Sequence, residues 1–180
     1  TDRVEVGAML RAHEYIDLVI PRGGADLIRR VRDEATMPVV AGGIGVCHTY
    51  IDADADLEMA RTIVVNAKTR RTSICNALDT VLVHEAVAAQ VMPELAQALG
   101  ERGVTLHVDE RAAALAGGGP VVAVDPADYD REWLSLDCSV RVVDSFEDAM
   151  AHIEEHGSGH SEAIITSDYR AARRFLHEVD

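Results

Sequence analysis

Aromatic residues and cysteines are scarce in this chain of 180 residues. Phe, Trp and Tyr together make up 4% of it, so the core must be built mainly from the plentiful Ala, Val and Leu side chains. The three cysteines, Cys47, Cys75 and Cys138, are too few and too scattered for a disulfide framework. An odd number of cysteines in a chain without a recognisable signal peptide fits a reducing compartment, and we expect a cytoplasmic protein.

Basic residues are also outnumbered. The chain has 17 Lys and Arg against 31 Asp and Glu, a formal net charge of −14. This balance argues against nonspecific binding to nucleic acid or to an anionic membrane, because both need a basic surface. A small anionic ligand is still compatible, since it needs only one or two cations and backbone N–H groups. No apolar run approaches the ~20 residues that span a bilayer, and the sequence has neither a G-x-G-x-x-G motif nor a Walker loop.

Segments with strand-like and helix-like hydrophobic spacing alternate along most of the chain. Such alternation, with connections long enough for a helix, predicts an α/β fold whose mainly parallel sheet has helices on both faces. The chain ends on a helix without a closing element, so we expect a fragment of a larger protein. The expected strands are 15–20, 38–40, 46–51, 78–84, 104–108, 121–124, 139–143 and 163–165, and the expected helices are 4–12, 25–35, 55–70, 92–102, 146–155 and 168–180.

Helix-capping and helix-breaking residues set the expected boundaries. Asp54 is predicted to cap the helix that follows it, and Ser145 and Ser167 the last two helices. Pro93 is predicted in the first turn of its helix, where proline is tolerated, and not in the middle. Residues 112–119 give no periodic signal and are predicted to be a loop.

Cys75 is the first candidate for chemistry. It lies between a long amphipathic helix and a hydrophobic strand, so the pattern places it in a loop held by rigid elements. Lys68, Arg70 and Arg71 lie within seven residues upstream, and nearby cations favour a reactive thiolate. Free cysteines are, however, among the most buried residue types. The residues alone therefore leave a catalytic thiol and an inert one equally open.

Three other segments carry weaker signals. Cys47 and His48 point to opposite faces of a strand and have no second Cys/His pair to complete a metal site, so we expect no metal and at most a site-lining His48. The segment 21–24, with Arg22, opens a helix and is either an anion-binding turn or an ordinary one. The segment 157–160 either binds a ligand through its backbone or ends a helix.

Three long blocks together resemble the γ-glutamyl phosphate reductase family (glutamate-5-semialdehyde dehydrogenases) of the aldehyde dehydrogenase superfamily. They read YIDLVIPRGGADLIRRV, MPVVAGGIGVCHTYIDADADLEMARTIVVNAKTRRTSICNALDTVLVH and HIEEHGSGHSEAIITSDYRAARRFLHEVD. The NAK…CNA and GSGH blocks are the most specific, and the resemblance extends over nearly all residues. It implies an aldehyde-dehydrogenase-like catalytic domain that acts in the second step of proline biosynthesis.

The resemblance implies that Cys75 is the nucleophile. Its thiolate would expel phosphate from L-glutamyl 5-phosphate, and the thioester would accept a hydride from NADPH to give L-glutamate 5-semialdehyde. A thiolate suits both steps, because it is a good nucleophile and a good leaving group. The oxyanion needs preorganised donors, for which Asn76 and the backbone N–H of Cys75 are the candidates. The candidate substrate-binding residues are Arg71, whose guanidinium suits a carboxylate best, then Lys68, His48 and Arg22.

Two departures from related sequences bear on the reaction. Hydrolytic aldehyde dehydrogenases carry a water-activating glutamate well before the cysteine, and the matching stretch here, 39–43, has no carboxylate. This agrees with a thioester that is reduced and not hydrolysed. Asp79 stands where the family is expected to have glutamate. Glu132 matches the superfamily's glutamate that holds the nicotinamide ribose, although the stretch around it, with Asp137 and Cys138, fits the family pattern loosely.

By the same resemblance, residues 1–42 would finish a cofactor-binding domain and residues 43–180 would form a catalytic domain that is incomplete at its C-terminus. The 180 residues alone are then expected to be inactive. The full-length enzyme would be a homo-oligomer, with an association with glutamate 5-kinase as a further expectation. Two alternatives are a CoA-acylating aldehyde dehydrogenase and a catalytically inactive domain that binds a small anion or a partner.

Overall fold

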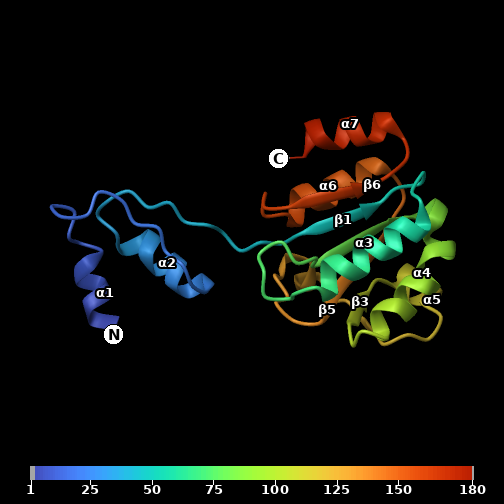
Figure 1. Cartoon of the computed structure of the whole chain (residues 1–180), viewed down its shortest axis with the longest axis horizontal. Helices are drawn as coiled ribbons and strands as arrows, with labels where there is room; N and C mark the ends of the chain where they lie inside the picture. Colours follow the sequence, from blue (N-terminus) through green and yellow to red (C-terminus); the bar gives the residue numbers. More distant parts are fainter. Residues whose placement is uncertain (1–2, 180) are drawn as a thin grey trace. The chain divides into compact units, whose positions relative to one another are not determined.

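The computed structural model describes residues 3–179. The chain divides into two compact units, Thr1–Ile44 and Gly45–Asp180 (Figure 1). The break falls two residues after the boundary expected from the sequence. Whether the two units are a cofactor-binding remnant and a catalytic domain remains a prediction.

The first unit contains α1 (Arg3–Met9) and α2 (Ala25–Glu34), both as expected. Val31 and Met37 are buried in its small core. The predicted strands 15–20 and 38–40 are wrong as strands, because they meet only in one isolated parallel bridge, Val19 with Val39. Among the described residues the two extended segments have only each other to pair with, and a lone parallel pair is marginal.

The second unit is built on a six-stranded sheet. Its order is β4-β3-β5-β2-β1-β6, and every neighbouring pair is parallel. This confirms the α/β class and the parallel sheet. The strands are β1 (His48–Ile51), β2 (Thr80–His84), β3 (Thr105–Val108), β4 (Val121–Ala123), β5 (Asp137–Val143) and β6 (Glu162–Ile165).

Helices cover both faces of this sheet (Figure 1). Side chains alternate along each strand, so Val81 and Val83 pack into a core with α3, α4 and α5 while Leu82 packs against α6 and α7. The helices are α3 (Leu57–Thr69), α4 (Glu85–Gly100), α5 (Glu110–Leu115), α6 (Phe146–His156) and α7 (Tyr169–Glu178), with a short 3₁₀ helix η1 (Pro126–Asp130). None of the helices in residues 3–179 combines the length and the apolar character that crossing a membrane requires.

Asp109 and Pro93 show where the sequence predictions of helices fail. The predicted loop 112–119 is wrong for residues 112–115, which belong to α5, because the Asp109 side chain accepts the N–H of Ala112 at 2.8 Å and nucleates the helix. Pro93 lies inside α4, which begins at Glu85. An interior proline costs about 3 kcal/mol. The apolar face of α4 continues on both sides of it and buries Val91 and Leu95, each worth about 1.5–3 kcal/mol.

Two N-caps are shifted from their predicted positions. Asp56 caps α3, accepting the N–H of Met59 at 2.9 Å, where Asp54 was expected. Asp168 caps α7, where Ser167 was expected. In both cases an aspartate closer to the first helical turn is available, and it satisfies an N–H that would otherwise lack an acceptor. The predicted cap Ser145 is confirmed, since its side chain accepts the N–H of Asp148.

Candidate active site

The parallel sheet gathers four loops along one edge. Because neighbouring strands run in the same direction, the loops that precede them meet at the amino edge of the sheet. The strand order β5-β2-β1-β6 therefore also gives the order of these loops. They are 131–136 before β5, 70–79 before β2, 45–47 before β1 and 157–161 before β6.

Cys75 is exposed on the second of these loops, in a turn that the N–H of Ala77 closes by donating to the Ile74 carbonyl at 3.0 Å. Asn76 beside it is exposed as well. Within residues 3–179, no acceptor is bonded to the backbone N–H of Cys75 or Asn76. Two unbonded N–H groups next to an exposed thiol fit the requirements of a nucleophile with an oxyanion hole.

The segment before β1 holds the Cys75 loop in place. The Cys47 thiol donates to the Cys75 carbonyl, with 3.2 Å between sulfur and oxygen. A Cβ at Gly45 would lie 2.4 Å from the same carbonyl oxygen, so only glycine allows this close approach. On its other side, the loop is anchored by the N–H of Leu78, which donates to the Ala67 carbonyl.

The GSGH block lies against the same segment from the opposite side. The Ser158 hydroxyl accepts the N–H of Val46 at 2.9 Å, and Nδ1 of the exposed His160 lies 3.9 Å from the Cys47 sulfur. Nothing in the sequence pattern connects His160 with Cys75. The Cys75 block and the GSGH block each directly precede a predicted strand, and this signal was available in the sequence. The sequence does not show that these two strands pair with β1 on either side.

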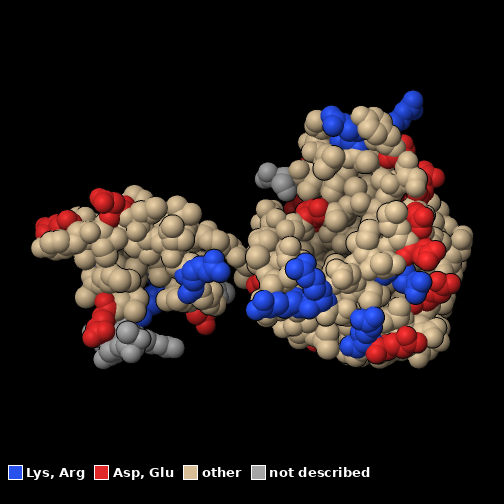
Figure 2. All heavy atoms as spheres, viewed as in Figure 1, with Lys and Arg blue, Asp and Glu red and all other residues tan. Residues whose placement is uncertain are grey.

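Lys68 is not placed to bind a substrate, the role predicted for it. Its side chain is fully buried, and its ammonium donates to the Leu78 carbonyl at 2.9 Å. A cation without exposed surface cannot contact a substrate in this structure, so Lys68 braces the loop instead. Arg70 and Arg71 are exposed, and Figure 2 shows basic side chains where Figure 1 places the loop between α3 and β2. Arg71 thus keeps its candidacy for binding a substrate anion.

His48 is also placed differently from its predicted role. Its exposure is 1%, and both its backbone N–H and its ring Nδ1 lie 2.9 Å from one carboxylate oxygen of Glu162. Its ring packs edge-on against His152, whose pKa is lowered to about 2, first by burial and then by the neighbouring His48, His156 and Arg141 side chains. His48 therefore belongs to the packing between β1 and α6, which excludes direct contact with a substrate here.

The two remaining candidates lie on separate segments. Glu132 is partly exposed on the loop before β5, at the same edge of the sheet as Cys75. A partly exposed carboxylate can accept hydrogen bonds from ribose hydroxyls, so this residue fits a nicotinamide cofactor. Arg22 is exposed on the first unit, two residues before Gly24, the N-cap of α2. In the part of the chain that is described, no group of three or more His, Cys, Asp or Glu could hold a metal ion.

The three thiols should differ sharply in reactivity. Burial raises the pKa of both Cys47 and Cys138 to about 12, with the Asp79 carboxylate adding to the effect at Cys47. A raised pKa keeps a thiol neutral and unreactive near neutral pH. At pH 8 we expect iodoacetamide to alkylate Cys75 at least about 100-fold faster than the other two cysteines. Peptide mass spectrometry of timed samples measures the three rates.

The same experiment in denaturant is the control. Unfolding removes the burial, so all three cysteines should then react at similar rates. Labelling of Cys47 in the folded chain at the rate of Cys75 would contradict the structural assignment of an accessible and an inaccessible thiol.

Comparison with known proteins places the chain among proteins of one type. Residues 1–134 match the model of the aldehyde dehydrogenase family. Curated relatives named gamma-glutamyl phosphate reductase are 54% identical in Cronobacter sakazakii and 50% identical in Escherichia coli, and each alignment covers 99% of this chain. The chain spans 43% of the length of these relatives.

Solved structures agree with this comparison. The gamma-glutamyl phosphate reductase of Thermotoga maritima has a TM-score of 0.95 and 40% identity, covering 100% of this chain and 43% of its own. The corresponding enzyme of Saccharomyces cerevisiae has a TM-score of 0.59 and 32% identity, covering 100% and 44%. The fold is therefore aldehyde-dehydrogenase-like, as the sequence resemblance implied.

Proposed function

The chain belongs to the aldehyde dehydrogenase family, and we propose that it is the catalytic part of an NADPH-dependent γ-glutamyl phosphate reductase of proline biosynthesis. The observation that carries this proposal is the exposed Cys75 beside two backbone N–H groups that have no acceptor among residues 3–179. The names of the relatives, gamma-glutamyl phosphate reductases, support the choice of substrate.

In the proposed reaction the Cys75 thiolate attacks the acyl carbon of L-glutamyl 5-phosphate. The new bond is a carbon–sulfur bond, and the bond that breaks is the one to the phosphate oxygen, so inorganic phosphate leaves. The N–H groups of Cys75 and Asn76 stabilise the oxyanion of the tetrahedral intermediate. Arg71 attracts the negatively charged substrate to the loop.

The cofactor supplies the hydride that reduces the thioester to the semialdehyde. Glu132 would hold the ribose hydroxyls of the cofactor, and collapse of the hemithioacetal returns the electron pair to the Cys75 sulfur. The loop around Cys75 carries no carboxylate from Lys68 to Leu78 that could activate water, which favours reduction of the thioester over its hydrolysis. We also propose that the full-length enzyme acts in the cytoplasm as a homo-oligomer, associated with glutamate 5-kinase.

The reverse reaction gives the sharpest test. A chain of the relatives' length that contains these 180 residues (the full-length enzyme) should reduce NADP⁺ over repeated turnovers in the presence of glutamate 5-semialdehyde, and only when inorganic phosphate is added. Phosphate is required because it must release the acyl group from Cys75. Absorbance of NADPH follows the reaction.

Two controls discriminate the alternatives. Coenzyme A in place of phosphate should give no repeated turnover of NADP⁺, whereas a CoA-acylating enzyme would need it. Repeated NADP⁺ reduction without phosphate and without coenzyme A would indicate hydrolysis of the thioester and would rule out the proposed reaction. Absence of turnover with either acceptor would favour an inactive binding domain.

A further inference from the structure

Asp79 joins three of the loops at the amino edge. It lies four residues after Cys75 and is 2% exposed. One carboxylate oxygen accepts the backbone N–H of Cys47 at 3.2 Å, and the other accepts the backbone N–H of Trp133 at 2.9 Å. Its own backbone N–H donates to the Cys47 carbonyl, and its carbonyl accepts the N–H of Ser139. One residue thus connects the Cys75 loop to the segments before β1 and β5.

An ionised Asp79 carboxylate in this buried position costs free energy of desolvation. Burial raises the pKa of the Asp79 carboxyl, and the Trp133 N–H, the Lys68 ammonium and the Cys47 N–H only partly oppose that effect. A neutral residue would avoid the cost of desolvation. The ionised carboxylate nevertheless provides two oxygens that accept backbone N–H groups, those of Cys47 and Trp133.

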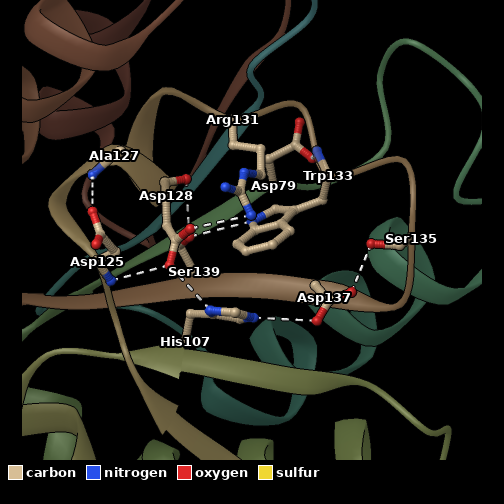
Figure 3. A network of polar contacts seen from close by, with 10 residues as sticks. All are labelled: Asp79, His107, Asp125, Ala127, Asp128, Arg131, Trp133, Ser135, Asp137 and Ser139. Carbon is tan, nitrogen blue, oxygen red and sulfur yellow. Dashed lines mark hydrogen bonds and ion pairs between the residues drawn. The ribbon is translucent and has the colours of Figure 1, made fainter.

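Trp133 is the tryptophan of this chain, and its ring is fixed on several sides (Figure 3). Its Nε1 donates to the Ser139 hydroxyl at 3.3 Å, and its ring centroid lies 4.2 Å from that of His107. The Arg131 guanidinium lies 4.8 Å from the same ring. Glu132 directly precedes Trp133 in the chain, so whatever fixes Trp133 also fixes the backbone of Glu132.

His107 extends the network beneath Trp133. Its Nδ1 lies 3.1 Å from a carboxylate oxygen of Asp128, and its Nε2 lies 3.2 Å from one of Asp137 (Figure 3). The loop before β5 is therefore supported from below by β3, η1 and β5. The hydrogen bond from the Trp133 N–H to Asp79 joins the loop before β5 directly to the Cys75 loop.

We propose that Asp79 is a positioning residue that sets the separation between the Cys75 thiol and the cofactor held at Glu132. This inference rests on the proposed function. Hydride transfer depends steeply on such a separation, and a misplacement of about 1 Å can cost about 100-fold in rate. The thiol itself does not contact Asp79, so its reactivity toward a small reagent should not depend on this carboxylate.

The test is Asp79→Asn in the full-length enzyme. Asparagine has nearly the same volume but offers one oxygen and one NH₂ group, so it cannot accept both N–H groups. We expect single-turnover hydride transfer to fall by about 10- to 100-fold, while the rate of Cys75 alkylation stays within about threefold of the wild-type rate. Asp79→Glu keeps two acceptor oxygens and should recover most of the hydride-transfer rate.

Asp109 provides a matched control. Its carboxylate also accepts two backbone N–H groups, from Ala112 at 2.8 Å and Val142 at 3.2 Å, but it follows β3 and so lies at the opposite edge of the sheet. Asp109→Asn should leave both rates unchanged per folded molecule. Trp133 fluorescence of the 180-residue chain should change with Asp79→Asn and stay constant with Asp109→Asn, whatever the activity of the enzyme.

The outcomes separate the inference from the function on which it rests. An active wild-type enzyme with unimpaired hydride transfer in Asp79→Asn would overturn the inference alone. A parallel fall of alkylation and hydride transfer would also overturn it, because Asp79 would then merely support the Cys75 loop. A wild-type enzyme that fails to reduce NADP⁺ would remove the proposed function and this inference with it.

Discussion

Replacing Cys75 with alanine in the full-length enzyme should lower the rate of phosphate-dependent NADP⁺ reduction by about 10⁴-fold or more. The reason is that the thiol forms the covalent bond in both halves of the proposed reaction, so no step bypasses it. Because Cys75 is exposed, its replacement removes no core packing and should leave folding intact. Initial rates at saturating aldehyde, cofactor and phosphate measure the loss.

Cys138→Ala is the matched control for this substitution. Cys138 has no exposed surface and packs in the core between the sheet and the helices on the α3 side. Its replacement should cost about 1–2 kcal/mol of folding stability but leave the rate per folded molecule unchanged. A Cys75→Ala enzyme that retained more than about one hundredth of the wild-type rate would indicate that another residue is the nucleophile.

The elements of the second unit follow from the sequence because local pattern and global packing agree. Each of its predicted strands overlaps an observed strand, and α3 and α6 appear where apolar residues recur at helical spacing. The wrong predictions have physical causes that hydrophobic periodicity alone does not reveal. Pro93 is tolerated because the buried face of α4 outweighs its cost, and residues 110–115 are helical because Asp109 supplies a cap.

The burial of Lys68 is predictable from its position on α3. The buried stripe of α3 includes Ala60 and Val64, and Lys68 follows Val64 by four residues. Residues at that spacing share one face of a helix, so helical phase alone would have predicted a buried lysine. Its proximity to Cys75 in sequence suggested a substrate cation, but the direction of its side chain is set by the helix.

The meeting of the site's loops could not be read from the sequence in the same way. A parallel sheet was predicted, but the order of its strands was not, and that order determines which loops are neighbours. Cys75 meets the segment before β1 because β2 pairs with β1, and the GSGH block meets it because β6 pairs with β1. Long-range pairing therefore brings His160 to the site, whereas Cys75 was found from local pattern and resemblance.

Lys68→Met should destabilise the chain by about 3 kcal/mol or more. Methionine keeps much of the length of the side chain but removes the ammonium. The Leu78 carbonyl then loses its donor, and the buried Asp79 carboxylate loses the cation that lowers its pKa. Urea unfolding of the 180-residue chain, followed by Trp133 fluorescence, measures the difference. Arg71→Met is the control, because its exposed guanidinium should contribute less than about 0.5 kcal/mol.

The loss in Lys68→Met should also depend on pH and on Asp79. A carboxyl whose folded pKa is raised above its ordinary value of 3.8 favours the folded state when protonated, and this contribution is lost as the pH rises through the folded pKa. Without Lys68 the folded pKa of Asp79 rises further, so the destabilisation should be smaller near pH 4 than at pH 7, where the unpaired Asp79 charge adds to the loss of the Leu78 donor. Adding Asp79→Asn should recover part of the loss at pH 7, because no buried charge is then left unpaired. A Lys68→Met chain within about 0.5 kcal/mol of wild type at pH 7 would mean that the buried ammonium does not brace the Cys75 loop.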